Sequence, residues 1–158
     1  MPSETPYVRL ANAADAEIWL TLRCALWEDP PEEHRAVIND FFASAIQEPQ
    51  AVLIAFDTAQ RGIGFAELSI RPYAEGCDTQ SVTYLEGWYV VPDCRGQGVG
   101  RALILAAETW GRSQGCCEFA SDADVDNEVS RLAHIALGFE DVGLIRCFRK
   151  DLAPDDRP

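Results

Sequence analysis

The sequence predicts a single α/β domain with one layer of mixed β-sheet and helices on its faces. Its 158 residues, 47% hydrophobic and 25% charged, match the composition of an ordinary globular domain with one core. The expected elements follow the order β, α, α, β, β, β, α, β, α, β along the chain. No internal repeat, linker or low-complexity segment interrupts this order, so we expect no second domain.

Hydrophobic periodicity together with cap and turn residues assigns each element. In order they are a strand over 7–10, a helix to Leu26, a helix from Pro31 to Pro49, strands over 51–56 and 63–70, a strand over 82–91, a helix over 99–113, a strand over 116–121, a helix to Leu137 and a strand over 142–149.

Helix-capping residues, prolines and apolar runs predict the first elements. Asn12 or Asp15 can cap the first helix, and Pro31 can begin the second, whose apolar stripe continues to Ile46. The turn over 57–62 joins two strands into a hairpin.

The later elements follow the same logic. β-branched and aromatic residues predict the strand that Pro92 ends. Asp126 or Asn127 can cap the last helix, and Gly138 ends it. We expect the domain to span 1–152 and the tail 153–158 to be disordered.

The charge balance restricts the class of partner. Thirteen basic residues against 26 acidic ones give a net charge of −13, which opposes binding to nucleic acids and anionic membranes and attracts cations. No apolar run is long enough to cross a bilayer, and the amino terminus lacks the order of a secretion signal, so a cytoplasmic protein is the default expectation.

The six cysteines predict neither disulfides nor a metal site. Without a secretion signal, and with a chain long enough to bury a core, we expect them to be reduced and to act as small buried hydrophobic residues. No C-x-x-C pair occurs and only two histidines are present, so we expect no zinc site.

The most distinctive motif is the segment 95–100, Arg-Gly-Gln-Gly-Val-Gly, between a predicted strand and a predicted helix. Glycines allow a ligand to approach the backbone, and free amides at a helix start favour phosphate oxygens. A Walker loop is excluded because Arg101 and Ala102 follow Gly100 where Lys and Ser or Thr are needed. The dinucleotide fingerprint has another spacing and belongs at the first βαβ unit. The pyrophosphate of an acyl-coenzyme A is the ligand that remains.

Arg95, Gly98 and Gly100 fill the central motif of the GCN5-related N-acetyltransferases (GNAT), and the sequence resembles this family in element order over almost the whole chain. The Ala-Leu-Gly-Phe segment at 136–139 matches a later motif of the family. The segments Leu-Glu-Gly-Trp-Tyr-Val at 85–90 and Phe-Ala-Ser-Asp-Ala at 119–123, with Asp126-Asn127, Leu26-Trp27 and Ser69-Ile70-Arg71 followed by Tyr73, look more narrowly like aminoglycoside 6'-N-acetyltransferases.

The resemblance implies a mixed, mostly antiparallel sheet whose fourth and fifth strands split to admit the pantetheine arm of acetyl-coenzyme A. It also implies a homodimer, as is frequent among related enzymes. The residues implied to bind the co-substrate are Trp88, Tyr89 and Val90 through their backbone, Arg95, Gly96, Gln97, Gly98, Val99 and Gly100 around the pyrophosphate, and Asn127 near the arm.

Glu86 and Asp122 are the candidate catalytic and substrate-binding carboxylates. A carboxylate inside an apolar strand is costly to bury unpaired, so Glu86 serves either a structural ion pair or an amine substrate, and the resemblance favours the amine. By strand alternation Glu86 shares a face with Tyr84 and Trp88. Asp122 follows a strand within an acidic run that otherwise reads as a solvated loop with a helix cap.

The aromatic and histidine candidates are less specific. Spacing alone assigns Trp27 to the core and Tyr73 to a loop, and the resemblance makes both candidate walls of a sugar site. Trp19 and Tyr84 are assigned to the core, and His34 to a solvated helix side. His134 stands where the family often has a tyrosine that protonates the departing thiolate; water in that role, or a structural histidine, is the alternative.

These residues predict direct transfer of acetyl to a primary amine in a ternary complex. Glu86 first, and Asp122 second, would orient the ammonium and take its proton, while the backbone N–H near Val90 would stabilise the oxyanion. Cysteine catalysis is not favoured because no cysteine lies beside a histidine in the pattern. The acidic balance suits a polycationic aminoglycoside. A polyamine, protein amino terminus or lysine as acceptor, and a non-catalytic sensor of acyl-coenzyme A, are the alternatives.

Overall fold

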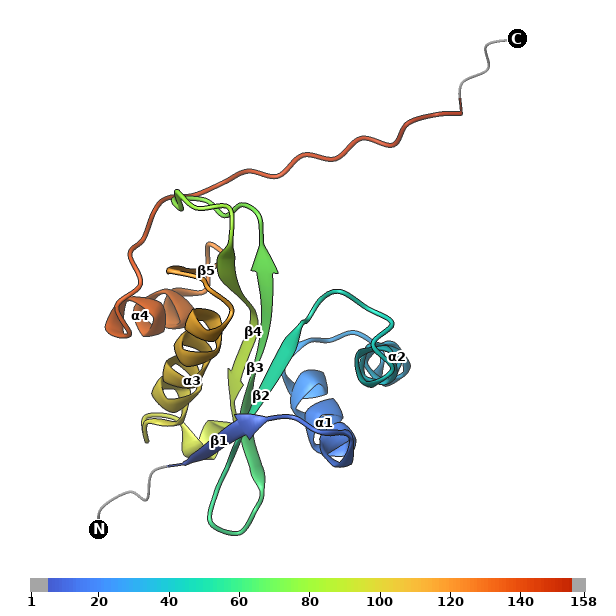
Figure 1. Ribbon diagram of the computed structural model, residues 1–158, viewed down its shortest axis with the longest axis vertical. Coiled ribbons are helices and arrows are strands. Elements are labelled where there is room, and N and C mark those ends of the chain that lie inside the picture. Colours follow the sequence, from blue (N-terminus) through green and yellow to red (C-terminus); the bar gives the residue numbers. More distant parts are fainter. Residues whose placement is uncertain (1–5, 155–158) are drawn as a thin grey trace. The chain divides into compact units, whose positions relative to one another are not determined.

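The computed structural model describes residues 6–154 (Figure 1). The chain forms two compact units, one up to Ala123 and one from Asp124 onward. The predicted domain boundary at 152 stays a prediction, and residues 155–158 of the predicted tail lie outside the described residues.

The first unit is built on a five-stranded sheet in the order β1-β2-β3-β4-β5. The strands are β1 (Tyr7–Leu10), β2 (Ala51–Phe56), β3 (Gly62–Arg71), β4 (Val82–Val90) and β5 (Glu118–Ser121). Neighbouring strands are antiparallel except β4 and β5, which are parallel. The predicted mixed, mostly antiparallel sheet is confirmed.

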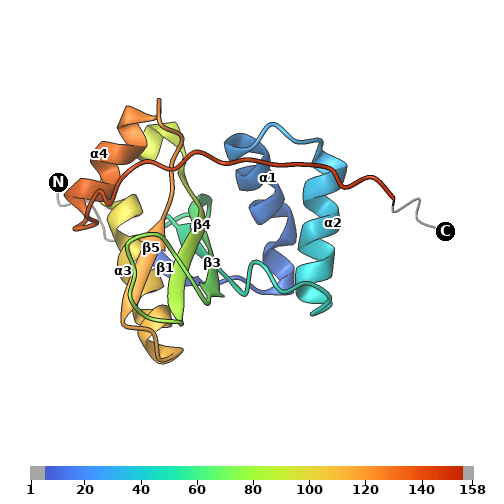
Figure 2. The same cartoon turned by 90° about the horizontal axis from the view of Figure 1, so that it is seen from above.

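Helices cover both faces of this sheet. They are α1 (Ala16–Leu26), α2 (Pro31–Phe42) and α3 (Val99–Ser113), with short 3-10 turns at η1 (Ala13–Asp15) and η2 (Pro92–Cys94). Helices α1 and α2 lie on one face and α3 on the other (Figure 2). The second helix ends at Phe42, before the predicted end, because Ser44 adopts a φ of +56° that α-helical geometry does not allow.

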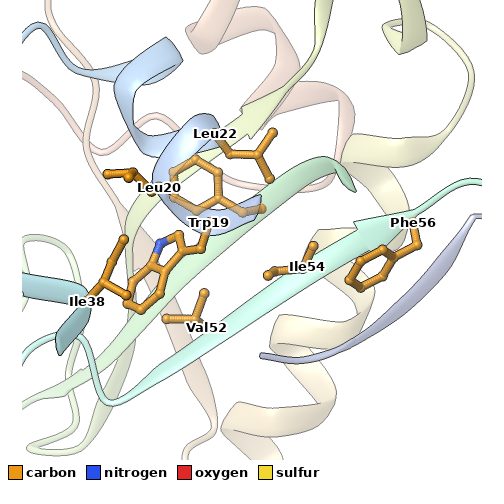
Figure 3. Packing of buried hydrophobic residues seen from close by; sticks show 8 residues of the cluster. Trp19, Leu20, Leu22, Ile38, Val52, Ile54 and Phe56 are labelled. Carbon is orange, nitrogen blue, oxygen red and sulfur yellow. The ribbon is translucent and has the colours of Figure 1, made fainter. Parts of the chain in front are cut away.

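One buried apolar cluster lies between the strands β2 and β3 and the helices α1 and α2. Strand β2 is buried along its whole length, as its continuous apolar run predicts. Figure 3 shows Val52, Ile54 and Phe56 on the same side of β2 as Trp19 of α1, and Trp19 is fully buried as predicted. His34 is only 2% exposed, so its predicted solvation is wrong: the side chain faces α1, where Arg23 provides a polar partner.

The second unit contains α4 (Glu128–Ala136), which Asn127 caps by accepting a hydrogen bond from the Ser130 amide. The strand predicted over 142–149 is wrong, because those residues form no strand in the structure. Their large apolar side chains are exposed, Phe148 by 89%. An apolar run supplies β propensity, but a strand forms only where a neighbouring strand accepts its backbone hydrogen bonds.

All six cysteines are free. Only Cys94 and Cys116 are buried, whereas Cys24, Cys117 and Cys147 are exposed, so the expectation that all six are buried is wrong. Burial depends on which face of an element a side chain occupies, which apolar character alone does not decide. Within residues 6–154, none of the helices has the length and apolar character that crossing a membrane requires.

Candidate active site

Strands β4 and β5 separate in the middle of β4. They pair from Val82 opposite Glu118 to Leu85 opposite Ser121, where β5 ends. Strand β4 continues to Val90 with no partner strand on this side among the described residues. The predicted split is therefore confirmed, and beyond Leu85 this edge of β4 pairs with no other strand of the described residues.

A β-bulge at Glu86 lies at the point of separation. Glu67 on β3 is opposite Gly87, and the next pair along the ladder already involves Leu85, so Glu86 has no partner residue on β3. Bulges redirect side chains and are frequent beside active sites. Asp122 directly follows the last paired residue of β5, so both candidate carboxylates lie at the mouth of the split.

The bulge changes which side chains share a face with Glu86. Arg71 bonds Glu86 and stacks on the ring of Tyr84, so Glu86 and Tyr84 lie together as expected. Trp88 lies on the other face, where a Cβ on Gly100 of α3 would be 3.0 Å from its indole. The expected placement of Trp88 beside Glu86 is wrong because the extra residue shifts the alternation by one.

Arg71, the last residue of β3, holds Glu86 through two hydrogen bonds. Nε is 2.9 Å from Oε1 and Nη2 is 2.6 Å from Oε2, and the bond to Glu86 raises the pKa of Arg71. The guanidinium carbon also lies 3.6 Å from the ring centroid of Tyr84. The Glu86 side chain is 18% exposed, so this ion pair leaves the carboxylate within reach of solvent.

Tyr84 links this pair to Asp122. Its phenol donates a hydrogen bond of 2.5 Å to Oδ2 of Asp122. Burial, together with the bond to Asp122, raises the pKa of Tyr84 well above its usual value, so the phenol remains a donor. Arg71 and Tyr84 thus join Glu86 and Asp122 into one chain of contacts.

Sequence reasoning missed both connecting residues. It assigned Tyr84 to the core and gave Arg71 no role, although Arg71 lies within a segment that carries the resemblance. Two signals were available in the sequence. Arg71 is a basic residue on the strand before the one that carries Glu86, and Tyr84 is an aromatic residue two positions before Glu86 on its own strand.

Trp27 also lies beside the bulge. It follows α1, and its indole packs on Gly87, where a Cβ would lie 2.4 Å from the ring. Tyr73 lies in the loop after β3 and is 63% exposed, and a hydrogen bond to Glu75 raises its pKa. The structure therefore places Trp27 against Gly87, the residue after Glu86, whereas the role of Tyr73 in a sugar site stays a prediction.

The free edge of β4 presents alternate backbone groups. The Val91 N–H donates to Ile63 of β3, so the Val90 N–H points to the opposite, open side. By the same alternation the Trp88 N–H faces the open edge, whereas the Tyr89 N–H faces β3. The N–H groups of Trp88 and Val90 therefore point to the side of β4 from which β5 has separated.

The turn before α3 leaves room for an anion. Gly96 and Gly98 have φ of +72° and +85°, a region that other residues rarely adopt. A Cβ at either position would meet nothing within 4 Å. Gly98 is the N-cap of α3, whose first amides, including those of Val99 and Gly100, have no carbonyl partner within the helix. Open amides at a helix N-terminus fit a phosphate group.

Two polar side chains brace this turn. Nε of Arg95 donates to the Val90 carbonyl across 2.9 Å, and Nε2 of Gln97 donates to the Asp93 carbonyl across 2.8 Å. The Arg95 guanidinium carbon also lies 5.5 Å from the ring centroid of Tyr89. The turn is thereby tied to the end of β4.

Two predicted site residues belong to the second unit. Asn127 uses its side chain to cap α4, as described above. Nδ1 of His134 lies 2.7 Å from the Ser130 carbonyl oxygen, which can only accept, so this nitrogen carries the proton. The His134 ring also makes an edge-to-face contact with Phe139. Proximity of Asn127 to the arm and proton donation by His134 stay predictions.

In the described part of the chain, no group of three or more His, Cys, Asp or Glu side chains could hold a metal ion.

Two known proteins are similar to this chain in sequence over nearly its whole length. The chain is 51% identical to an aminoglycoside N(6')-acetyltransferase type 1 of Klebsiella aerogenes over 94% of its own length and 98% of the relative. It is 38% identical to a protein of the same name from Stenotrophomonas maltophilia, over 98% of this chain and 99% of that one.

Solved structures of proteins with related names are similar to this chain in fold. AAC(6')-Iy in complex with the bisubstrate analog CoA-S-monomethyl-acetylneamine superimposes with a TM-score of 0.87 at 37% identity, over 94% of this chain and all of that one. The aminoglycoside 6'-N-acetyltransferase AAC(6')-Ih of Acinetobacter baumannii gives 0.86 at 33% identity, with the same two coverages. The model of the acetyltransferase (GNAT) family matches residues 16–139, and the chain belongs to this family.

Proposed function

We propose that the protein transfers acetyl from acetyl-coenzyme A directly to the 6'-amino group of aminoglycosides. The observation that carries this proposal is the split between β4 and β5, which has two carboxylates at its mouth and an open glycine turn at the start of α3. The names of the relatives, at identities up to 51% over nearly the whole chain, support the aminoglycoside as the acceptor.

The co-substrate is a thioester with a pyrophosphate at one end and amides along its arm. The turn from Arg95 to Gly100 binds the pyrophosphate through its free amides, and glycine leaves the approach open. The amides of Trp88 and Val90 bind the pantetheine arm along the free edge of β4. Asn127, from α4, contributes near the arm.

The amine substrate arrives as an ammonium and must lose a proton before it can attack. Glu86 is the first candidate to orient the ammonium and accept its proton, and Asp122 is the second. Arg71 and Tyr84 hold these carboxylates in place. Trp27, and Tyr73 from the loop after β3, form the walls against which the sugar packs.

The reaction forms one bond and breaks another. The nitrogen lone pair forms a bond to the thioester carbonyl carbon, and the Val90 N–H stabilises the oxyanion of the tetrahedral intermediate. The attacking nitrogen then gives up a second proton to solvent, the carbon–sulfur bond breaks, the electron pair leaves with sulfur, and the thiolate takes a proton from His134 or from water. No covalent acyl-enzyme is required, because both substrates are held together.

The acidic surface assists a polycationic acceptor. With 26 acidic against 13 basic residues, the net charge of −13 attracts cations over a long range and raises the rate of encounter. Polyamines and lysine-containing peptides carry the same sign of charge, so charge alone does not select the aminoglycoside.

A thiol-release assay tests the proposed function. Purified protein with acetyl-coenzyme A is mixed separately with kanamycin-type aminoglycosides, spermidine and a lysine peptide, and free thiol is measured over time. Release with aminoglycosides, and acetylation of the 6'-nitrogen by NMR, is the expected result. Release only with the other amines would identify a different acceptor, and calorimetric binding of the coenzyme without turnover would identify a sensor.

We also propose a homodimer that acts in the cytoplasm, where acetyl-coenzyme A is available. The exposed apolar side chains of Leu144, Ile145 and Phe148 support a partner surface, because a second copy can cover them. Light scattering is expected to give the mass of two chains, and Leu144→Asp with Phe148→Asp is expected to give one. A wild-type mass of one chain at micromolar concentration would contradict the dimer.

A further inference from the structure

A second network of charged side chains is buried under the face of the sheet that carries Glu86. Glu67 of β3 is 2% exposed and accepts hydrogen bonds from Nε of Arg23 at 2.6 Å and from Nε1 of Trp19 at 2.8 Å. A second bond joins Nη2 of Arg23 to the other carboxylate oxygen at 3.3 Å. The proposed mechanism uses none of these groups.

The network continues through a histidine to the backbone of Trp27. Nη1 of Arg23 lies 3.1 Å from Nδ1 of His34, and because a guanidinium only donates, Nδ1 must accept. The proton of the neutral imidazole is then on Nε2, which donates to the Trp27 carbonyl at 3.4 Å. The His34 ring also stacks on the Trp27 ring, 6.4 Å between centroids.

Trp27 is held from several sides by this arrangement. The Arg23 guanidinium carbon lies 4.7 Å from its ring centroid, and Phe65 meets it edge to face at 6.0 Å. On the sheet side the indole packs on Gly87, which is directly opposite Glu67 in the β3–β4 ladder. Gly87 is the residue after the bulged Glu86, so the network ends at the proposed substrate site.

Stability alone does not account for such a network. A buried ion pair loses so much hydration that apolar side chains of similar volume often stabilise a protein equally well. Apolar side chains form no directional hydrogen bonds. The guanidinium of Arg23 and the two ring nitrogens of His34 form such bonds and thereby fix the positions of their partners. The same network contacts both the ring and the carbonyl of Trp27.

We propose that Glu67, Arg23 and His34 are positioning residues that hold Trp27 against Gly87 and thereby set the affinity for the acceptor amine. The proposal rests on the proposed function, in which Trp27 forms a wall of the sugar site. None of the three residues contacts the substrate; each acts through Trp27.

The kinetic test compares two substitutions of His34. The Gln side chain of His34→Gln can still accept from Arg23 and donate to the Trp27 carbonyl, whereas His34→Leu can do neither. We expect His34→Leu to raise KM for the aminoglycoside about tenfold, as loss of an aromatic anchor does, with KM for acetyl-coenzyme A and kcat within about threefold of wild type. His34→Gln is expected to remain within about threefold of wild type in all three constants.

A double-mutant cycle with Trp27→Ala separates positioning from general weakening. If His34 acts through Trp27, adding His34→Leu to Trp27→Ala leaves KM for the aminoglycoside unchanged. Ile38→Ala is the matched control, because Ile38 is buried on the same helix, α2, and its apolar side chain forms none of the hydrogen bonds of the network, so its loss is expected to lower Tm while those bonds remain. The proposal would be overturned if the two single substitutions raise KM for the aminoglycoside by factors that multiply in the double variant. It would also be overturned if Ile38→Ala raises this KM as much as His34→Leu does.

A spectroscopic readout keeps the test independent of turnover. With 5-fluorotryptophan incorporated, the ¹⁹F resonance of Trp27 is assigned by its loss in Trp27→Phe. It is expected to shift in His34→Leu and to stay in place in His34→Gln and Ile38→Ala. An unmoved resonance in His34→Leu would show that the network does not hold Trp27. Wild-type protein that acetylates no aminoglycoside would instead refute the proposed function, with the resonance still deciding on the network.

Discussion

The phenol of Tyr84 donates a 2.5 Å hydrogen bond to Asp122, so the strand that carries Glu86 is tied to the residue that directly follows β5. Arg71 stacks on the same phenol ring and forms an ion pair with Glu86. The positions of the two candidate carboxylates are therefore coupled through one aromatic side chain.

Removal of the Tyr84 hydroxyl tests this coupling. In Tyr84→Phe the ring under Arg71 remains, but Asp122 loses a hydrogen bond to a charged group, so kcat/KM for the aminoglycoside is expected to fall about tenfold. Thiol release measures the change. Tyr7→Phe, at an exposed position on β1, is the control and should leave kcat/KM unchanged. An unaltered Tyr84→Phe enzyme would show that the hydrogen bond does not position Asp122.

Neutral isosteres of the two carboxylates test the proton acceptor. Glu86→Gln and Asp122→Asn are each expected to lower kcat for the aminoglycoside, by about a hundredfold for the residue that takes the proton. Calorimetric affinity for acetyl-coenzyme A should change by less than about twofold, because neither side chain belongs to the glycine turn. If kcat falls in neither variant, the assignment of both residues is wrong.

The glycine turn is tested by a side chain at Gly98. A valine at this position would have to adopt a φ of +85°, and its side chain would fill the space that is open to a phosphate. Gly98→Val is therefore expected to raise the Kd for acetyl-coenzyme A at least about tenfold. It should also lower the free energy of unfolding by about 1–2 kcal/mol.

Gly115→Ala is the matched control for that strain. Gly115 has a φ of +83° and equally open surroundings, but it follows the other end of α3. Its substitution is expected to lower the free energy of unfolding by about 1 kcal/mol while Kd stays the same. Equal Kd values for wild type and Gly98→Val would remove the turn from the binding site.

The ion pair between Arg9 and Asp15 predicts a pH dependence of stability. Hydrogen bonds from Arg9 at 2.6 and 2.9 Å, with one from the Asn12 amide, lower the pKa of Asp15 below its usual value. A lowered pKa in the folded state contributes stability that is fully present above the unfolded pKa of about 3.9 and is lost as pH falls through the folded pKa.

Asp15→Asn is therefore expected to lower the free energy of unfolding by about 1–2 kcal/mol at neutral pH, with a smaller difference from wild type in strong acid. Urea titrations at several pH values measure this difference. Asp40→Asn, on the exposed side of α2, removes the same charge and should differ little from wild type at any pH. A difference for Asp15→Asn that does not shrink in acid would contradict the assignment.

Local sequence signals predicted most of the fold. The bounds of β2 and α3 were predicted to the residue, because an uninterrupted apolar run and a glycine turn followed by an amphipathic stripe are local patterns. The split between β4 and β5, and the carboxylates beside it, followed from motifs shared with the GNAT family. The strand over 142–149 was wrong because pairing depends on a partner strand that no local pattern supplies.

The identities of Glu86, Asp122 and the glycine turn can be read from the order of residues along the chain, since each depends on side-chain type and on near neighbours. The bulge that turns Glu86 toward Tyr84, the bond from Tyr84 to Asp122, and the burial of His34 beside Arg23 come from strand register and helix docking. These contacts join residues up to 38 positions apart in sequence, so only the folded chain brings their atoms within bonding distance.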